Sequence, residues 1–174
     1  TLQLAAAGAL VTALDLSHQR LKRVEDNLAR CKLGASIVAG DALEHAGLYD
    51  AILLDAPCSA TGTIRRHPDL PHVHEGERIS ELIGLQAEML DHALSLLKPG
   101  GRLVYATCSL IPDEGECQIE DLLARTPGLT VLRPEAEGLE ERWFSEEGGL
   151  RLRPDYWAER GGMDGFYMAV LQKP

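Results

Sequence analysis

The sequence contains no uninterrupted run of about 18 apolar residues, which excludes a membrane-spanning helix of the usual kind. The first 15 residues have no positively charged leader before their apolar part, so we do not expect them to form a secretory signal peptide. An initiator methionine is also lacking, from which we expect that an upstream segment has been removed. With 174 residues and no internal repeat, the chain suits one ordinary domain, and we predict a single domain over residues 1–174.

Positive charge is scarce, because 17 Lys and Arg face 27 Asp and Glu and the net charge is −10. Nucleic-acid binding depends on Lys and Arg that neutralise phosphates. A domain of this charge will not wrap nucleic acid by electrostatics alone, so such a role requires a local basic patch or a part outside this sequence. The hydrophobic share of 45% and the charged share of 25% are those of a globular protein and exclude a disordered or collagen-like chain.

Cysteine is also infrequent, and the four residues form neither a CxxC pair nor a Cys/His ligand pattern: Cys31, Cys58, Cys108 and Cys117. We therefore expect no metal site and predict reduced thiols in a cytoplasmic protein. Cys31 and Cys117 fall on predicted helices, where a lone cysteine is usually a small buried hydrophobic residue.

Short β-rich runs alternate with amphipathic helical runs, a pattern typical of an α/β fold with a largely parallel sheet. Strands are predicted at residues 11–15, 35–39, 50–55, 102–107 and 165–171. Helices are predicted before Gly34, over 78–97, and from Pro112 to about residue 125, where the acids after Pro112 suit a helix N-terminus. Residues 57–77 predict a loop, and the acidic segment 135–147 predicts an irregular surface excursion.

Three acids, Asp15, Asp41 and Asp55, each close a predicted strand. Ligands of open α/β sheets bind beyond the carboxyl ends of the strands, where an acid commonly accepts the ribose hydroxyls of a nucleotide cofactor. A helix N-cap explains Asp15 equally well when it is taken alone. Three acids at one edge are harder to explain as caps.

The segment 55–69 reads DAPCSATGTIRRHPD, and residues 106–110 read ATCSL. Together with LDLS at 14–17, GDA at 40–42, LKPGG at 97–101 and GGMDGF at 161–166, these motifs resemble the RNA cytosine-C5 methyltransferases of the Sun/Fmu (RsmB-like) family. The resemblance covers nearly the whole chain. It implies a class I S-adenosylmethionine-dependent methyltransferase fold, which is a Rossmann-like sheet with helices on both faces, and S-adenosyl-L-methionine as the cofactor.

The resemblance also implies the catalytic residues. In this family the cysteine of Thr-Cys-Ser adds to cytosine C6 and activates C5 for methylation, a role that falls on Cys108. The cysteine of Pro-Cys assists release of the methylated product, which is Cys58 here. Asp55 would lie against the cytosine ring.

Binding residues follow from the same resemblance. Asp15 would accept the ribose hydroxyls of the cofactor, Asp41 would lie beside its adenine, and Asp55 and Pro57 would complete the cofactor site. Arg65, Arg66 and His67 would face RNA, where phosphate contacts position the strand. A solvated basic turn is the alternative for these three residues. The expected substrate is a single-stranded or loop nucleotide, in small-subunit ribosomal RNA for the bacterial relatives.

The chain departs from the family at its start. The family's glycine-rich turn, Ala-Pro-Gly-Gly-Lys-Thr, and its first strand are missing, and that strand lies between the strands predicted at 11–15 and 50–55. We therefore expect poor cofactor affinity and a fragment that is weakly active or inactive. We also expect the unpaired strand edges to be compensated. The compensation would be a homodimer, a swapped contact, closure of the sheet across the gap, or a sample that once held more chain.

Two other functions fit part of the sequence. A class I methyltransferase acting on a small molecule explains the acids at the strand ends but leaves both cysteine motifs without a purpose. A non-catalytic RNA-binding module fits the missing glycine turn, yet both cysteines are retained. Substitution of Cys108 distinguishes them, because only the cytosine methyltransferase would lose a covalent RNA adduct.

Overall fold

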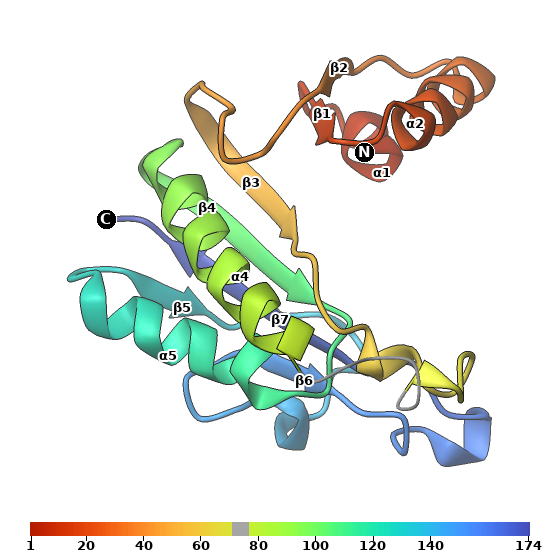
Figure 1. The fold of residues 1–174 in the computed structure, drawn as a ribbon, viewed down its shortest axis with the longest axis vertical. Helices are drawn as coiled ribbons and strands as arrows, with labels where there is room; N and C mark the ends of the chain where they lie inside the picture. Colours follow the sequence, from red (N-terminus) through yellow and green to blue (C-terminus); the bar gives the residue numbers. More distant parts are fainter. Residues whose placement is uncertain (71–76) are drawn as a thin grey trace. The chain divides into compact units, whose positions relative to one another are not determined.

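The computed structural model describes residues 1–70 and 77–174, whose contacts divide into two compact units, residues 1–46 and 47–174. The elements of the first unit are α1 (Leu2–Ala6), β1 (Thr12–Asp15), α2 (His18–Cys31) and β2 (Ser36–Ala39). Strands β1 and β2 pair in parallel, with Asp15 opposite Ala39, and α2 packs on both (Figure 1). Helix α2 begins after Ser17, whose hydroxyl accepts the Arg20 N–H at 3.3 Å and caps the first turn.

The second unit is built on a five-stranded sheet of order β3-β4-β7-β5, in which β6 also pairs with β7. Its elements are β3 (Tyr49–Asp55), η1 (Thr61–Thr63), α4 (Glu77–Ser95), β4 (Leu97–Thr107), η2 (Pro112–Glu114), α5 (Glu116–Arg125), β5 (Thr130–Leu132), η3 (Glu141–Trp143), β6 (Leu150–Leu152), η4 (Ala158–Arg160) and β7 (Phe166–Gln172). Helices α4 and α5 lie together on one face of this sheet (Figure 1). The core between these helices and the sheet is apolar and includes Leu54, Leu90, Leu103, Ile119, Leu122 and Leu171.

The predicted α/β class and all five predicted strands are confirmed, but the sheet of the second unit is mixed. Only β3 and β4 pair in parallel there, whereas β7 runs antiparallel to β4, β5 and β6. The expectation of a largely parallel sheet is therefore wrong for this unit. Strands β5 and β6 were not predicted, because three residues each are too few to show a period of two.

Several boundaries and burials also differ from the predictions. The helix expected from Pro112 is interrupted at Gly115, where φ −133° and ψ −99° are not helical, so η2 and α5 are separate. Strand β4 begins at Leu97 because that residue pairs with Tyr49. Cys31 is exposed and Cys117 half-buried, so neither is the buried hydrophobic residue that was expected.

The acidic segment 135–147 is only partly a surface excursion. Trp143 within it is 2% exposed and stacks on Tyr156, with ring centroids 5.4 Å apart. The loop expected at 57–77 holds the short helix η1, and residues 71–76 of that prediction lie outside the described part of the chain.

Within the described residues, β1 has β2 as its one strand neighbour and β3 has β4. Along the free edge strand β3, Leu53 is 57% exposed. The dimeric or swapped contact expected at such edges stays a prediction, as does the single domain. No described helix is both long and apolar enough to cross a membrane.

Candidate active site

Two cysteine-bearing loops meet at the carboxyl ends of β3 and β4. The strands are parallel neighbours with Asp55 opposite Ala106, so the loops that follow leave the sheet side by side. Cys58 and Cys108 lie three and two residues beyond this pair, and their sulfur atoms are 3.5 Å apart. Both side chains are half-buried. The structure therefore brings together the two cysteines that the motifs single out.

The two thiols differ in acidity. The pKa of Cys108 is lowered to about 7, chiefly because the Cys58 side chain hydrogen-bonds to it, while burial and the negative charge of Asp55 oppose the shift. The pKa of Cys58 is raised well above its ordinary value by its hydrogen bond with Cys108 and by burial. Cys108 therefore ionises first and Cys58 keeps its proton. Because the thiolate is the nucleophilic form of cysteine, this difference favours Cys108 over Cys58 as the more reactive thiol.

A buried carboxylate lies behind the two loops. Glu114 is fully buried and accepts hydrogen bonds from the residues that follow each cysteine. The Ser59 N–H donates to it at 2.9 Å, and the hydroxyls of Ser59 and Ser109 each donate at 2.5 Å. Gln86 of α4 adds a fourth hydrogen bond at 3.1 Å and also donates to the Pro57 carbonyl at 2.8 Å.

Sequence reasoning missed these polar residues. Glu114 was assigned to a helix N-terminus, and Gln86 was one position within the helix predicted over 78–97. A signal was present in the serine that follows each motif cysteine, but the residue that both serines contact lies outside the two motifs. Glu114 becomes that shared partner only because the loop after β4 folds back toward the serines, and local sequence patterns do not predict such a fold-back.

Close backbone packing fixes the η1 turn against the last glycine motif. Gly62 donates to the Cys108 carbonyl at 2.9 Å and accepts from the Gly165 N–H at 2.7 Å. A Cβ at Gly62 would lie 2.0 Å from the Gly165 carbonyl oxygen, so no larger residue fits there. The turn and the GGMDGF motif are therefore built around glycine contacts beside Cys108.

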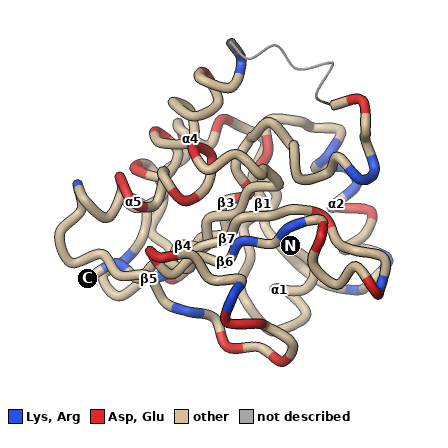
Figure 2. The backbone as a smooth tube through the Cα atoms, turned by 90° about the horizontal axis from the view of Figure 1, so that it is seen from below, with Lys and Arg blue, Asp and Glu red and all other residues tan. Residues whose placement is uncertain are grey.

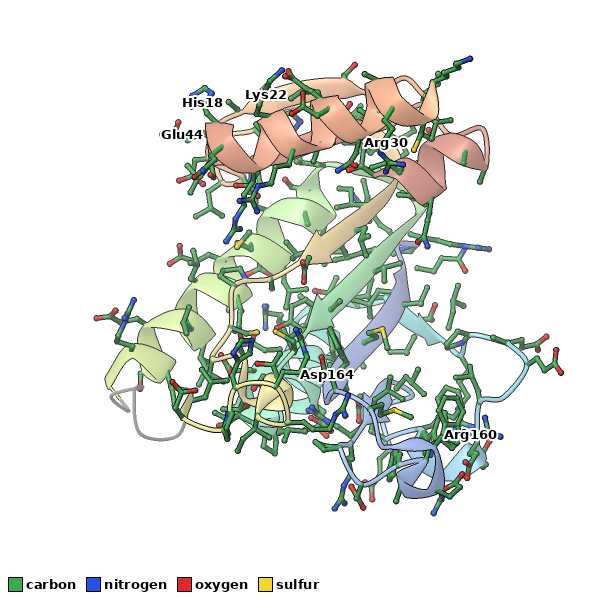
Figure 3. All side chains as sticks on the ribbon, turned by 90° about the vertical axis from the view of Figure 1, so that its right-hand side faces the viewer. His18, Lys22, Arg30, Glu44, Arg160 and Asp164 are labelled. Atoms are coloured by element: carbon green, nitrogen blue, oxygen red, sulfur yellow. The ribbon has the colours of Figure 1, made fainter. Side chains whose placement is uncertain are left out.

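The three basic residues expected to face RNA lie on the exposed side of this turn. The Arg66 guanidinium pairs with Asp164 at 2.7 Å, and Figure 3 shows Asp164 beside the turn. Arg65 donates to the Gly161 carbonyl at 3.1 Å. His67 is exposed and closes the turn through its backbone N–H. Both arginines thus have partners within the chain, while part of each side chain stays accessible.

A cavity of about 250 Å³ opens beside Cys58. Its walls come from the loop after β3 and from the first turns of α4, with Cys58, Ser59, Arg78, Ile79, Glu81, Leu82 and Leu85 as the lining. Apolar, charged and thiol groups all contribute to this lining.

The acids expected to hold a cofactor lie where the strands end. In the first unit, Asp15 ends β1, accepts the Ser17 N–H at 2.7 Å and is 31% exposed. Asp41 follows β2, accepts the Leu43 N–H at 2.9 Å and is exposed. In the second unit, Asp55 and Pro57 are exposed. Each acid keeps acceptor capacity for hydroxyl or amino donors, which fits the ribose and adenine of S-adenosylmethionine.

Charges elsewhere are mixed in sign, and blue and red segments alternate along the backbone in Figure 2. In the first unit, Lys22 of α2 pairs with Glu25 and Asp26. Among the described residues, no group of three or more His, Cys, Asp or Glu side chains is placed to hold a metal ion.

Comparison with known proteins identifies the relatives of this arrangement. Residues 1–172 match the 16S rRNA methyltransferase RsmB/F family. The ribosomal RNA small subunit methyltransferase B of Vibrio vulnificus is 45% identical over 168 residues, which are 94% of this chain and 36% of the relative. The chain thus spans about a third of the length of that curated relative.

Solved structures show the same fold. A methyltransferase homologue from Pyrococcus horikoshii is 32% identical, with a TM-score of 0.76 over 95% of this chain and 54% of that one. NSun6 from Pyrococcus horikoshii, solved with the S-adenosylmethionine analogue SFG, is 26% identical, with a TM-score of 0.74 over 95% of this chain and 41% of that one. The chain belongs to the 16S rRNA methyltransferase RsmB/F family.

Proposed function

We propose that this chain is the catalytic part of an S-adenosylmethionine-dependent RNA cytosine-C5 methyltransferase that acts on small-subunit ribosomal RNA in the cytoplasm. The observation that carries the proposal is the pair of sulfur atoms, 3.5 Å apart, at the ends of two parallel strands. The name of the Vibrio relative supports the choice of RNA. Both compact units would belong to one catalytic domain.

Cys108 is the nucleophile in this proposal. Its thiolate forms a bond to cytosine C6, and the electrons of the C5–C6 double bond move toward C5 and the ring nitrogen N3. A pKa of about 7 leaves roughly half of the Cys108 thiols ionised at neutral pH, so no separate base is needed to start the reaction. Asp55, whose charge acts on Cys108, would hydrogen-bond the ring as it becomes protonated at N3.

Cys58 acts at the end of the reaction. After methylation, the C5 proton passes to a solvent water molecule, the C5–C6 double bond re-forms and the C6–S bond breaks, with its electrons returning to sulfur. The Cys58 thiol keeps its proton and lies within hydrogen-bond distance of that sulfur. It thereby stabilises the departing thiolate, which is the role expected of the Pro-Cys cysteine.

The remaining residues bind and orient. When bound, S-adenosylmethionine supplies the electrophilic methyl group, and Asp15 and Asp41 would hold its ribose and adenine while Asp55 and Pro57 border it. The exposed parts of Arg65, Arg66 and His67 would contact RNA phosphates. The cavity beside Cys58 would receive a cytosine that has left its stack.

Nucleoside analysis tests the proposal. The chain is incubated with excess S-adenosylmethionine and small-subunit ribosomal RNA, and the digested RNA is assayed for 5-methylcytidine by mass spectrometry. The expected result is 5-methylcytidine formation, weak in this fragment and stronger once the missing glycine-rich turn and first strand are restored, that is lost in Cys108→Ala and retained in Cys31→Ala, a matched substitution of an exposed thiol. Equal formation by Cys108→Ala would refute the assignment, and RNA binding without methylation would favour the binding-only module.

A further inference from the structure

We propose that Glu114 is a positioning residue of this active centre, whose carboxylate ties the Cys58 loop to the Cys108 loop and sets the separation of the two sulfur atoms. The inference rests on the proposed function only in that it takes both thiols to be catalytic groups. The ties themselves are hydrogen bonds of the structure.

The Glu114 carboxylate accepts hydrogen bonds from the residue that follows each cysteine. Ser59 is held at two points, its N–H on one carboxylate oxygen at 2.9 Å and its hydroxyl on the other at 2.5 Å. Ser109 is held by its hydroxyl on that second oxygen, also at 2.5 Å. One carboxylate oxygen is thus shared by the two loops, which come from strands about 50 residues apart in sequence.

The backbone of Glu114 is fixed by hydrogen bonds from side chains of β4. The hydroxyls of Tyr105 and Thr107, both on β4, donate to the Glu114 backbone carbonyl at 2.9 Å and 3.2 Å. Thr61 closes the network from the η1 turn, with its hydroxyl 3.2 Å from that of Ser109 and accepting the Leu110 N–H at 2.9 Å. The carboxylate is therefore fixed relative to the sheet, and the two cysteine loops are fixed relative to it.

Only a carboxylate satisfies all these donors. A buried charge is stable when enough hydrogen bonds replace water, and Glu114 receives four. A glutamine of the same shape has one acceptor oxygen and one donor group, so it would turn an N–H₂ toward serine or glutamine donors. One loop would then lose its tie, and the hydrogen bond between the sulfur atoms would lengthen.

The direction in which neutralising Glu114 shifts the pKa of Cys108 distinguishes a positioning role from an electrostatic one. Among the described residues, the charged groups that act on Cys108 are Asp55 and Glu114, and the negative charge of each raises the pKa of Cys108. If Glu114 acted by charge alone, neutralising it would lower that pKa and make Cys108 more reactive. If it positions Cys58, neutralising it weakens the hydrogen bond that stabilises the thiolate, and Cys108 becomes less reactive at neutral pH.

The test is the pH dependence of iodoacetamide alkylation at Cys108, followed by peptide mass spectrometry in the whole chain. For Glu114→Gln we expect the half-maximal pH to move upward by about one unit and the rate at pH 7 to fall about fivefold, because the ionised fraction of Cys108 then drops from about one half to about one eleventh. Asp113→Asn, the same change at the exposed neighbouring residue, is the matched control and should leave the profile unchanged. A profile of Glu114→Gln that is unchanged or shifted downward would overturn the proposal.

A milder variant covers the case in which Glu114→Gln does not fold, as judged by circular dichroism. Ser109→Ala removes one tie and no charge, and we expect a smaller upward shift from it; an unchanged profile would overturn the proposal. Because alkylation requires neither RNA nor cofactor, its outcome is independent of the methylation assay. A shift in a chain that forms no 5-methylcytidine, even with the missing glycine-rich turn and first strand restored, would support positioning while refuting the proposed function.

Discussion

The Cys58 sulfur lies 3.5 Å from the Cys108 sulfur, although the two residues are 50 positions apart in the chain. The contact joins the Pro-Cys and Thr-Cys-Ser motifs across parallel strands β3 and β4. Because one thiol is held as a donor to the other, the pair combines a reactive sulfur with a proton source.

The reactivity of Cys108 should depend on Cys58. The lowered pKa of Cys108 means that its thiolate predominates above about pH 7 and that alkylation slows as the pH falls below that value. Cys58→Ala removes the hydrogen bond that is the main cause of the shift, so alkylation at pH 7 should slow by about tenfold. The measurement is the iodoacetamide rate against pH, with the exposed Cys31 as an internal reference. An identical Cys108 profile in Cys58→Ala would contradict this explanation of the acidity.

Mild oxidation should link the two sulfur atoms. Hydrogen peroxide oxidises the Cys108 thiolate to a sulfenic acid, and the Cys58 thiol then displaces water to form a disulfide, with two peroxide-derived water molecules as products. Intact mass should fall by two hydrogens, and peptide mapping should recover a Cys58–Cys108 peptide. Cys117→Ala should behave as the parent chain does. A link that used Cys31 or Cys117 instead would show that the motif sulfurs are not neighbours in solution.

Gly62→Ala should destabilise the second unit strongly. Its Cβ would lie 2.0 Å from the Gly165 carbonyl oxygen and 2.8 Å from that of Cys108, and backbone at that distance has to move. We expect the free energy of unfolding to fall by about 2 kcal/mol or more, as for other overpacked sites.

Gly84→Ala is the matched control for this change. Gly84 is an exposed position of α4 with no atom within 4 Å of its added Cβ, so alanine should stabilise the helix by about 0.5–1 kcal/mol. Urea unfolding of both variants measures the two effects. The same sign for both substitutions would argue against close packing at Gly62.

The Arg66–Asp164 pair should contribute to the stability of the fold in the absence of RNA. A double-mutant cycle with Arg66→Ala and Asp164→Ala should give a coupling of about 0.5–1 kcal/mol that weakens with added salt. The pair Arg160–Glu159 is a suitable comparison, because both side chains are largely exposed and 3.8 Å apart, and we expect no measurable coupling there. Zero coupling for Arg66 and Asp164 would leave RNA contact as the remaining role of Arg66.

Much of the fold followed from local patterns. Strands β1, β2 and β3 each carry a short apolar run that ends near an acid, and the structure has strands at all three places. The cysteine pair followed from two motifs at the ends of strands that proved to be neighbours. In both cases the informative residues are close in sequence to the element they define.

What was missed depends on tertiary contacts. Glu114 has the sequence context of a helix-terminal acid, and only the fold-back of the loop after β4 buries it between two serines. Trp143 lies in an acidic segment but is buried by Tyr156, which follows 13 residues later. Strands β5 and β6 form because β7 offers them an edge, which three-residue sequences cannot reveal.

The most direct test of the account is covalent trapping on RNA that contains 5-fluorocytosine, with S-adenosylmethionine present and intact mass as the measurement. Fluorine at C5 cannot leave as a proton does, so addition of the Cys108 thiolate and methylation should leave the chain bound to RNA. The account predicts an adduct with the parent chain and with Cys58→Ala, and none with Cys108→Ala. An adduct that persists in Cys108→Ala, or none with any form even after the missing glycine-rich turn and first strand are restored, would contradict the assignment of Cys108 as the nucleophile.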